Sequence, residues 1–184
     1  IVEPTIDTDV VIVLDCGNLE RVSANLNEFT GTIINIDHHI TNDKYVDINY
    51  IDSKAAATAE IVFELLVKMG IDFDNENSNT LREIGTCIYT SIVTDTGAYR
   101  HSNVTERTHD ISAKLKKIGV YNTNIYQNLF DNKDFSRIKI IGKALSSMQL
   151  ILNGKVALLE IDKDFTKDLG VDDIGDTSDI ISYG

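Results

Sequence analysis

The chain has 184 residues, a length that fits one domain or one domain with part of a second. Its 17 basic and 29 acidic residues give a formal net charge of −12, which argues against binding of long-duplex DNA, since such binding needs a basic surface that displaces counterions. The 42% hydrophobic content suffices for a packed core. The chain has no 18-residue apolar run, so no membrane span is predicted. It also has no basic start followed by an apolar stretch, so no secretory signal is predicted.

Strand patterns dominate the start of the chain. The apolar, β-branched run over 9–14 predicts a buried strand of a parallel sheet, and 31–36 predicts a second. A short helix is expected between them over 18–27, which gives a β-α-β order. Residues 49–52 suggest a short third strand.

Helical spacing of apolar residues follows. The predicted helices cover 55–69, 77–93, 105–118, 122–130 and 136–150. Gly70 and Gly119 are expected to end the first and third of them. The pair Asn153-Gly154, between two apolar runs, is typical of a β-hairpin turn.

The character of the pattern changes near residue 134. We therefore predict an α/β domain over 1–133, built on a parallel sheet with flanking helices, and a connector helix with the beginning of a second α/β domain over 134–184. The last stretch, 162–184, contains no complete unit, and the chain starts at Ile1 and not at Met. Both features led us to expect a piece of a longer protein.

Polar side chains that can carry chemistry come where predicted strands and helices end. Asp15 ends the first strand, Asp37-His38-His39 ends the second, and Thr94-Asp95-Thr96-Gly97 follows a helix. Neighbouring parallel strands would bring the first two groups to one edge of the sheet, where ligands bind in open α/β folds. Carboxylates and imidazoles together suit Mn²⁺, Zn²⁺ or Fe²⁺.

Each of these features also has a purely structural interpretation. An Asp at a strand end, such as Asp15, commonly forms a turn or caps a helix, and Asp95-Thr-Gly is commonly a turn. Aspartic proteases use such a triplet, but nothing else here resembles one. Adjacent histidines after a strand cannot both face the core, and imidazoles in a cleft need partners. From residue chemistry alone, both interpretations of Asp37-His38-His39 stay open.

Taken together, the three motifs resemble the DHH phosphoesterase superfamily. The strings that carry the resemblance are Leu14-Asp15-Cys16-Gly17, Asn35-Ile36-Asp37-His38-His39-Ile40 and Ile92-Val93-Thr94-Asp95-Thr96-Gly97-Ala98-Tyr99-Arg100. The last string, with 102–105 after it, is most similar to the branch that contains nanoRNase and pAp phosphatase enzymes. The resemblance covers most of the chain, including the connector helix and the Gly154 hairpin that begins the second domain, DHHA1.

The resemblance implies a metal-dependent phosphoesterase that works with two metal ions, expected to be Mn²⁺, with Mg²⁺ or another divalent metal left open. Asp15 would bridge the two ions, and His38 and Asp95 would bind one of them. His39 would bind or polarise the phosphate, and Asp37 would orient the pair. The implied substrates are very short oligoribonucleotides and 3′-phosphoadenosine 5′-phosphate.

Four residues after Asp95 are candidates for substrate contacts: Arg100, His101, Ser102 and Asn103. Arg100 follows the Asp95 loop and could contact phosphate, although an ordinary surface arginine is the structural alternative, and His101 is equally open. Ser102 and Asn103 would line the mouth of the site.

Two departures from the family pattern bear on activity. The family opens with a strand followed by His-x-x-Pro-Asp-x-Asp-Ala, which supplies further metal ligands, but the only proline here is Pro4, in Val-Glu-Pro-Thr. The family's second domain carries a Gly-Gly-Gly-His stretch that is also absent. We therefore expect a domain without its first strand and motif, half a metal site, and little activity from this polypeptide alone.

Alternatives remain at this point. One is a cyclic-dinucleotide phosphodiesterase of the same superfamily, and another is a catalytically silent piece that self-associates through an exposed sheet edge. A homodimer is left open, and no membrane partner is expected. A processive single-strand exonuclease is disfavoured, because the acidic chain offers no basic track for the strand. Two cysteines, Cys16 and Cys87, cannot form a disulfide scaffold, which favours a reduced, cytoplasmic setting.

Overall fold

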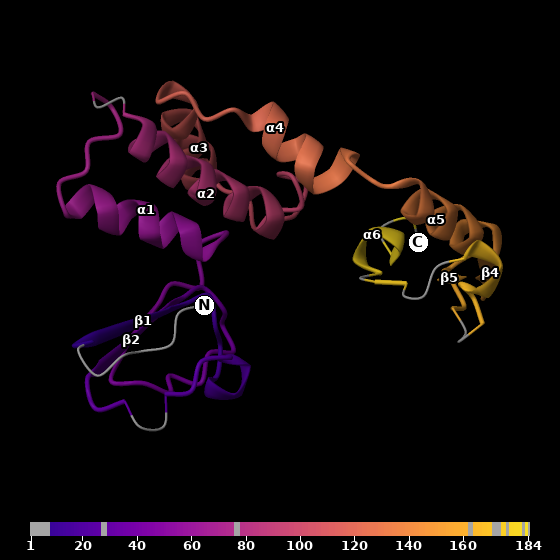
Figure 1. Ribbon diagram of the computed structural model, residues 1–184, viewed down its shortest axis with the longest axis horizontal. Coiled ribbons are helices and arrows are strands. Elements are labelled where there is room, and N and C mark those ends of the chain that lie inside the picture. Colours follow the sequence, from indigo (N-terminus) through magenta and orange to yellow (C-terminus); the bar gives the residue numbers. More distant parts are fainter. Residues whose placement is uncertain are drawn as a thin grey trace. The chain divides into compact units, whose positions relative to one another are not determined.

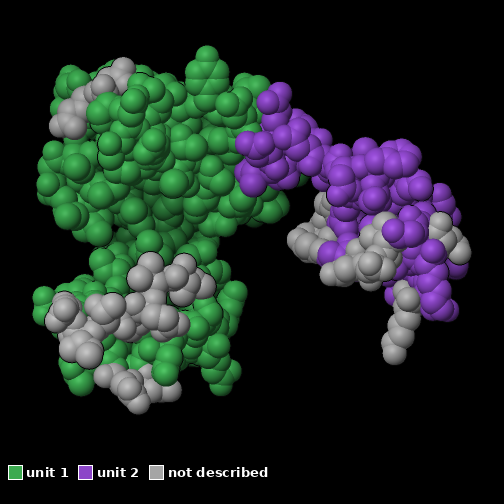
Figure 2. Space-filling view, viewed as in Figure 1, with its two compact units in different colours: residues 1–125 green, residues 126–184 purple. Residues whose placement is uncertain are grey.

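The computed structural model of the chain describes residues 8–26, 29–75, 78–161, 164–170, 174–175, 177–181 and 183. These residues belong to two compact units, residues 1–125 and residues 126–184 (Figure 2). Pro4 lies outside the described residues, as do the predicted end of one helix at Asn27 and the predicted start of another at Asn77. The bounds of the predicted last stretch, 162 and 184, lie outside them too.

Unit 1 begins with a three-stranded parallel sheet in the order β1-β2-β3, of which Figure 1 labels β1 and β2. The strands are β1 (Val10–Leu14), β2 (Thr32–Asp37) and β3 (Ile48–Ile51). Leu14 pairs with Ile36, so β1 and β2 end at the same edge of the sheet. The three predicted strands and their parallel order are confirmed. The predicted burial of the first strand is wrong, because Val10, Ile12 and Leu14 of β1 are 47%, 57% and 49% exposed.

The predicted helix over 18–27 is wrong for the described residues, because only a 3₁₀ turn, η1 (Leu19–Arg21), forms there. Asn18 caps this turn, with its Oδ1 accepting from the Arg21 N–H at 3.1 Å. Val22 is already extended, at φ −76° and ψ 112°. A segment this short cannot nucleate a stable helix, and its polar residues bond to the backbone in turns instead.

Four helices and a π-helical turn complete unit 1 and the start of unit 2: α1 (Thr58–Lys68), α2 (Asn79–Asp95), α3 (Glu106–Lys117), α4 (Asn122–Tyr126) and η2 (Gln127–Asp131). Figure 1 shows α1, α2 and α3 packed side by side. The sequence placed α2 over 77–93, whereas the helix continues through Asp95. The Asp95 carboxylate is therefore held by the last turn of a helix and not by a loop.

The helices of unit 1 pack closely where α2 meets α3. Gly85 of α2 is buried, and a Cβ added there would lie only 2.9 Å from Ile118 Cδ1 and 3.3 Å from Leu115 Cδ2. Leu115 itself has no exposed surface. A second, smaller cluster of Ile36, Ala55 and Ile61 joins β2 to α1. These contacts pack α2 against α3, and β2 against α1, within unit 1.

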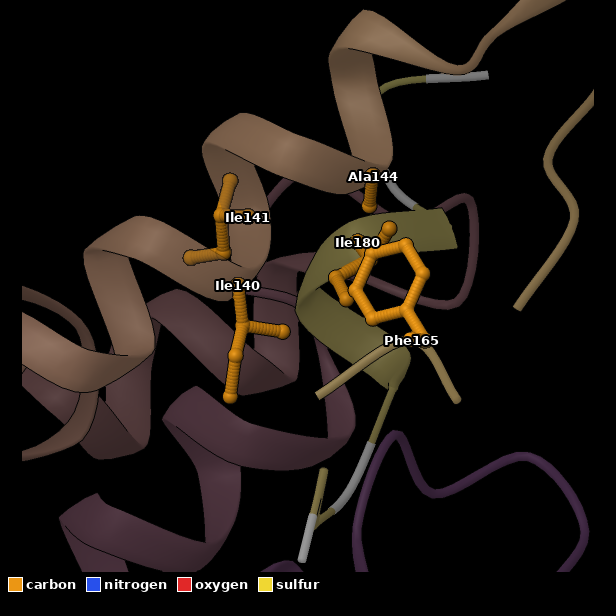
Figure 3. Close-up of a cluster of buried hydrophobic side chains, with 5 residues drawn as sticks. All are labelled: Ile140, Ile141, Ala144, Phe165 and Ile180. Carbon is orange, nitrogen blue, oxygen red and sulfur yellow. The ribbon is translucent and has the colours of Figure 1, made fainter. Parts of the chain in front are cut away.

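Unit 2 contains α5 (Phe135–Ser146), the antiparallel hairpin β4 (Gln149–Ile151) and β5 (Val156–Leu158), η3 (Lys167–Leu169) and α6 (Ser178–Ile181). The predicted hairpin is confirmed, with Asn153 and Gly154 at positive φ, but the helix predicted to reach 150 ends at Ser146 because β4 takes the following residues. The core of the unit consists of Ile140, Ile141, Ala144, Phe165 and Ile180 (Figure 3).

The two units meet in the chain at residues 125 and 126, whereas the sequence placed a domain boundary at 133 and 134. The assignment of 134–184 to a DHHA1 domain stays a prediction.

Both cysteines are free, Cys16 buried and Cys87 exposed. Among the described residues, no helix has the length and apolar character needed to cross a membrane.

Truncation of a buried side chain at the α2–α3 contact tests this packing. We expect Leu115→Ala to lower the free energy of unfolding by about 2–5 kcal/mol, because it removes buried contacts and leaves a cavity. Met69→Ala is the matched control, since Met69 is 71% exposed, and should change stability by less than about 0.5 kcal/mol. Urea unfolding followed by circular dichroism measures both. Equal losses in the two variants would contradict the packing.

Candidate metal centre

The sheet edge gathers the polar residues that follow β1 and β2. Asp15 comes directly after β1, Asp37 is the last residue of β2, and His38 and His39 follow it. Because the two strands are parallel and in register, one ligand atom from each of these four residues lies within 4.8 Å of the others. The arrangement places carboxylates and imidazoles in one cluster, as a metal site requires.

His38 lies between carboxylates from two different elements. Its Nε2 is 3.5 Å from Asp15 Oδ1 and 3.9 Å from Asp95 Oδ2. Its Nδ1 is 3.1 Å from the carbonyl oxygen of Ala55. Since a carbonyl oxygen can only accept, Nδ1 must carry the proton, and in the neutral ring Nε2 keeps its lone pair. A histidine whose other ring N–H is donated to a backbone carbonyl is the usual arrangement of a metal ligand.

Asp95 has an oxygen that lacks a partner. Its Oδ2 atom is buried and makes no hydrogen bond to the residues that the structure describes. Burial raises the pKa of Asp95, and the nearby negative charge of Asp15 raises it further, against the opposing effect of His38 and His39. A cation beside this oxygen would relieve both the burial and the repulsion.

Asp15 is held by its backbone and by a hydroxyl group. Its φ of +58° is left-handed, a conformation that Asp tolerates better than most residues. The Thr58 hydroxyl donates to Asp15 Oδ1 at 2.8 Å. Thr58 was not a sequence candidate, and nothing in its local sequence marks it, because its partner lies 43 residues away.

Asp37 is fully buried, and its carboxylate accepts several hydrogen bonds. Oδ1 accepts from the backbone N–H of His38 at 2.8 Å and from His39 Nδ1 at 2.7 Å, while Oδ2 accepts from Asn42 Nδ2 at 2.6 Å. Burial raises the pKa of Asp37, but these hydrogen bonds outweigh it and hold the pKa below its ordinary value. Asp37 is therefore an ionised group that orients His39 through the ring nitrogen Nδ1.

Two side-chain amides, of buried Asn35 and half-buried Asn42, form a network that supports Asp37, and neither was a candidate from the sequence. Asn42 Nδ2 lies 2.8 Å from Asn35 Oδ1 and 3.2 Å from the carbonyl oxygen of Cys16. Asn35 in turn donates to the Cys16 carbonyl at 3.2 Å. An asparagine inside the apolar run of β2 could have indicated the network, because a buried amide must find partners.

The candidate substrate residues lie in the turn after α2. Gly97, Ala98 and Tyr99 all have left-handed φ values of 53°, 60° and 64°. Arg100 is exposed, and its Nε donates to the Gly97 carbonyl at 2.7 Å. The His101 imidazole occupies the space that a Cβ at Gly97 would take, so this position requires glycine on two counts.

Ser102 and Asn103 complete the candidate set. Ser102 is exposed. The side-chain amide of Asn103 donates to the Ala56 carbonyl at 3.1 Å and to the Asp95 carbonyl at 3.2 Å. These contacts attach the turn to Asp95, and a substrate contact by any of the four candidates stays a prediction.

The residues present fit a divalent cation. Asp15, His38 and Asp95 offer two carboxylates and an imidazole nitrogen, and one of the carboxylate oxygens, Asp95 Oδ2, is buried without a hydrogen-bond partner among the described residues. Mixed oxygen and nitrogen donors of this kind suit Mn²⁺ and its neighbours among the divalent metals. The fold and the cluster define an α/β protein with a carboxylate–imidazole site at the sheet edge.

Known proteins resemble this chain in sequence and in fold. The DHH family, N-terminal domain, matches residues 2–92. A bifunctional oligoribonuclease and PAP phosphatase NrnA of Thermus thermophilus is 30% identical over 134 residues, which are 73% of this chain and 39% of that protein. A protein of the same name from Bacillus subtilis is 27% identical over 166 residues, 90% of this chain and 51% of that protein.

The crystal structure of an exopolyphosphatase-related protein from Bacteroides fragilis is similar in fold. It superposes with a TM-score of 0.83 at 26% sequence identity, over 96% of this chain and 51% of that one. The chain belongs to the DHH family, as its motifs led us to expect. It spans about half, or less, of the length of the relatives it matches.

The buried carboxylate of Asp37 makes stability depend on pH. A pKa lowered by folding contributes stability above the unfolded pKa of about 3.9, and this is lost as pH falls through the folded value. We expect Asp37→Asn to be about 1–3 kcal/mol less stable than wild type at pH 7, with the difference shrinking below pH of about 4. Urea unfolding between pH 2 and 7 measures it, with exposed Asp43→Asn as the control. A difference independent of pH would contradict the ionised Asp37.

Proposed function

We propose that this chain carries the metal-binding and phosphate-binding residues of a phosphoesterase that hydrolyses very short oligoribonucleotides, 3′-phosphoadenosine 5′-phosphate, or both. Membership of the DHH family and the names of the relatives from Thermus thermophilus and Bacillus subtilis support the class of reaction. The observation that carries the proposal is the position of His38, whose Nδ1 faces the Ala55 carbonyl while its Nε2 lies near the carboxylates of Asp15 and Asp95.

Asp15, His38 and Asp95 would hold a divalent cation at the sheet edge. Such a cation supplies Lewis-acid activation of water and neutralises the charge that develops on the phosphoryl oxygens. The backbone turn after β1 and the last turn of α2 present the two carboxylates from separate elements. This arrangement suits a cation, which would offset the repulsion between the two carboxylates.

His39 and Asp37 form a pair suited to phosphate. The Nδ1–H of His39 is donated to Asp37, so Nε2 is the nitrogen that can take up or give a proton. His39 is 40% exposed, which leaves it accessible to a substrate. The buried carboxylate of Asp37 fixes the orientation of the His39 ring, as an orienting carboxylate does in other hydrolases.

The charge of the chain favours a small substrate. At a net charge of −12, a long nucleic acid would meet repulsion along its backbone, whereas a nucleotide or dinucleotide presents few phosphates. Exposed Arg100, beside the Gly97 carbonyl, is the candidate for binding such a phosphate. We therefore propose that the site selects short substrates over long nucleic acids.

Substitution of the site residues in the complete protein tests these roles as a set. We expect Asp15→Ala to reduce hydrolysis most and His38→Ala to remove bound metal. His39→Ala should retain metal but slow turnover by about 10²–10³-fold, because its contact acts on the phosphate in the transition state. Metal content by elemental analysis and hydrolysis of 3′-phosphoadenosine 5′-phosphate give the two readouts. Loss of metal in His39→Ala and its retention in His38→Ala would reverse the assignment.

A second variant tests substrate binding separately. Arg100→Ala should raise the KM for a ribodinucleotide or for 3′-phosphoadenosine 5′-phosphate and leave metal content unchanged, since a uniform binding contact affects ground state and transition state alike. The comparison substrate is a long single-stranded RNA, which the wild type should cleave poorly. Faster cleavage of the long RNA than of the dinucleotide would overturn the substrate class.

A further inference from the structure

The 52–58 loop, which joins β3 to the first residue of α1, contacts two of the proposed metal ligands directly. Its Ala55 carbonyl accepts from His38 Nδ1 at 3.1 Å, and its Thr58 hydroxyl donates to Asp15 Oδ1 at 2.8 Å. The first contact selects the His38 tautomer that leaves Nε2 unprotonated. The loop therefore decides which ring nitrogen of His38 faces the two carboxylates.

The same loop reaches the third proposed ligand through Asn103. The Ala56 carbonyl accepts from Asn103 Nδ2 at 3.1 Å, and the same amide donates to the Asp95 carbonyl at 3.2 Å. The first residue of the loop also contacts the site, because the Asp52 N–H donates to the Asp37 carbonyl at 3.0 Å. A shift of this loop would disturb all three proposed ligands together.

A buried carboxylate holds the loop at the start of α1. Glu60 has no exposed surface, and its Oε2 accepts from the Ala56 N–H at 3.1 Å. The N-cap residue of α1, Ala57, has no side chain that could accept a hydrogen bond, so Glu60 reaches back to the loop in its place. Its other oxygen, Oε1, is buried without a hydrogen-bond partner among the described residues.

Arg107 of α3 supplies the positive charge that Glu60 requires. Its Nε lies 3.5 Å from Glu60 Oε2, and its Nη1 donates to Asp52 Oδ2 at 2.7 Å. The guanidinium thus contacts Asp52, the first residue of the loop, and Glu60, which accepts from the Ala56 N–H. A buried carboxylate without a cation is costly, so the nearby guanidinium offsets the burial of Glu60 and holds its side chain in place.

We propose that Glu60 and Arg107 are positioning residues for the metal centre. Their ion pair holds the 52–58 loop so that the Ala55 carbonyl keeps the proton of His38 on Nδ1 and leaves Nε2 for the metal. The proposal rests on the metal site described under the proposed function. Neither residue touches substrate or metal, and each acts through the loop.

Ring spectra of His38 test the proposal without metal. In the ¹⁵N-labelled protein, at a pH where imidazole is neutral, wild-type His38 should show the Nδ1–H tautomer. Glu60→Gln keeps an oxygen for the Ala56 N–H but removes the charge that faces Arg107, and Arg107→Lys keeps the charge but loses the planar fork. Both variants should shift His38 toward a mixture of tautomers. They should also weaken Mn²⁺ binding about 10-fold or more, the usual effect of losing a group that orients a ligand.

Glu64→Gln is the matched control. Glu64 is 45% exposed and lies 2.8 Å from Arg107 Nε, yet it belongs to the second turn of α1 and not to the loop. This variant should keep the His38 spectrum and the Mn²⁺ affinity of the wild type. Urea unfolding of every variant reports the loss of stability separately.

The outcomes distinguish the two proposals. An unchanged His38 spectrum in both Glu60→Gln and Arg107→Lys, with Mn²⁺ affinity within twofold of wild type, would overturn the positioning role whatever the loss of stability. The same changes in Glu64→Gln would also overturn it. A wild-type protein that binds no Mn²⁺ would contradict the metal site, while the ring spectra still decide whether Glu60 and Arg107 set the tautomer.

Discussion

The site depends on the hydrogen bonds that satisfy the buried carboxylate of Asp37. A carboxylate with no exposed surface is costly unless its oxygens are satisfied, and here the donors include Asn42 and the backbone N–H groups of His38 and His39. The bonds that satisfy the charge also bend the chain after β2. The directions in which the two imidazoles leave the strand therefore follow from the need to solvate one buried anion.

The turn after α2 shows that the protein tolerates local strain near the site. Ala98 and Tyr99 are both left-handed, which costs about 1–2 kcal/mol for each such residue. The turn is tied at both sides, by the Thr96 hydroxyl on the Ile92 carbonyl at 2.6 Å and by the contact of Tyr99 Oη with Ser112 Oγ at 2.7 Å. The strained turn and the half-buried Asp95 are consecutive in the chain, so the same packing stabilises both.

The sequence predicted those parts of the fold that depend on local pattern. Apolar runs marked the strands, and parallel order was enough to bring Asp15 to the same edge as His38. The residues that were missed act over long distances: Thr58 meets Asp15 from 43 positions away, and Arg107 meets Asp52 from 55. Such polar residues look ordinary in their own segments. The helix wrongly expected over 18–27 failed for the opposite reason, because local propensity without packing does not sustain so short a helix.

The partner of His38 Nδ1 is a main-chain carbonyl, and this has an evolutionary consequence. A side-chain partner can be lost by a single codon change, whereas the carbonyl of residue 55 persists whatever amino acid occupies that position. Change at position 55 is then limited by the buried space around Ala55, which is 5% exposed, and by its N–H, which donates to the Asp52 carbonyl at 3.1 Å. The residues that determine the course of the backbone, and not the side chain at position 55, therefore control the tautomer. Related proteins can keep the proton on the same ring nitrogen even when the side chain at this position differs.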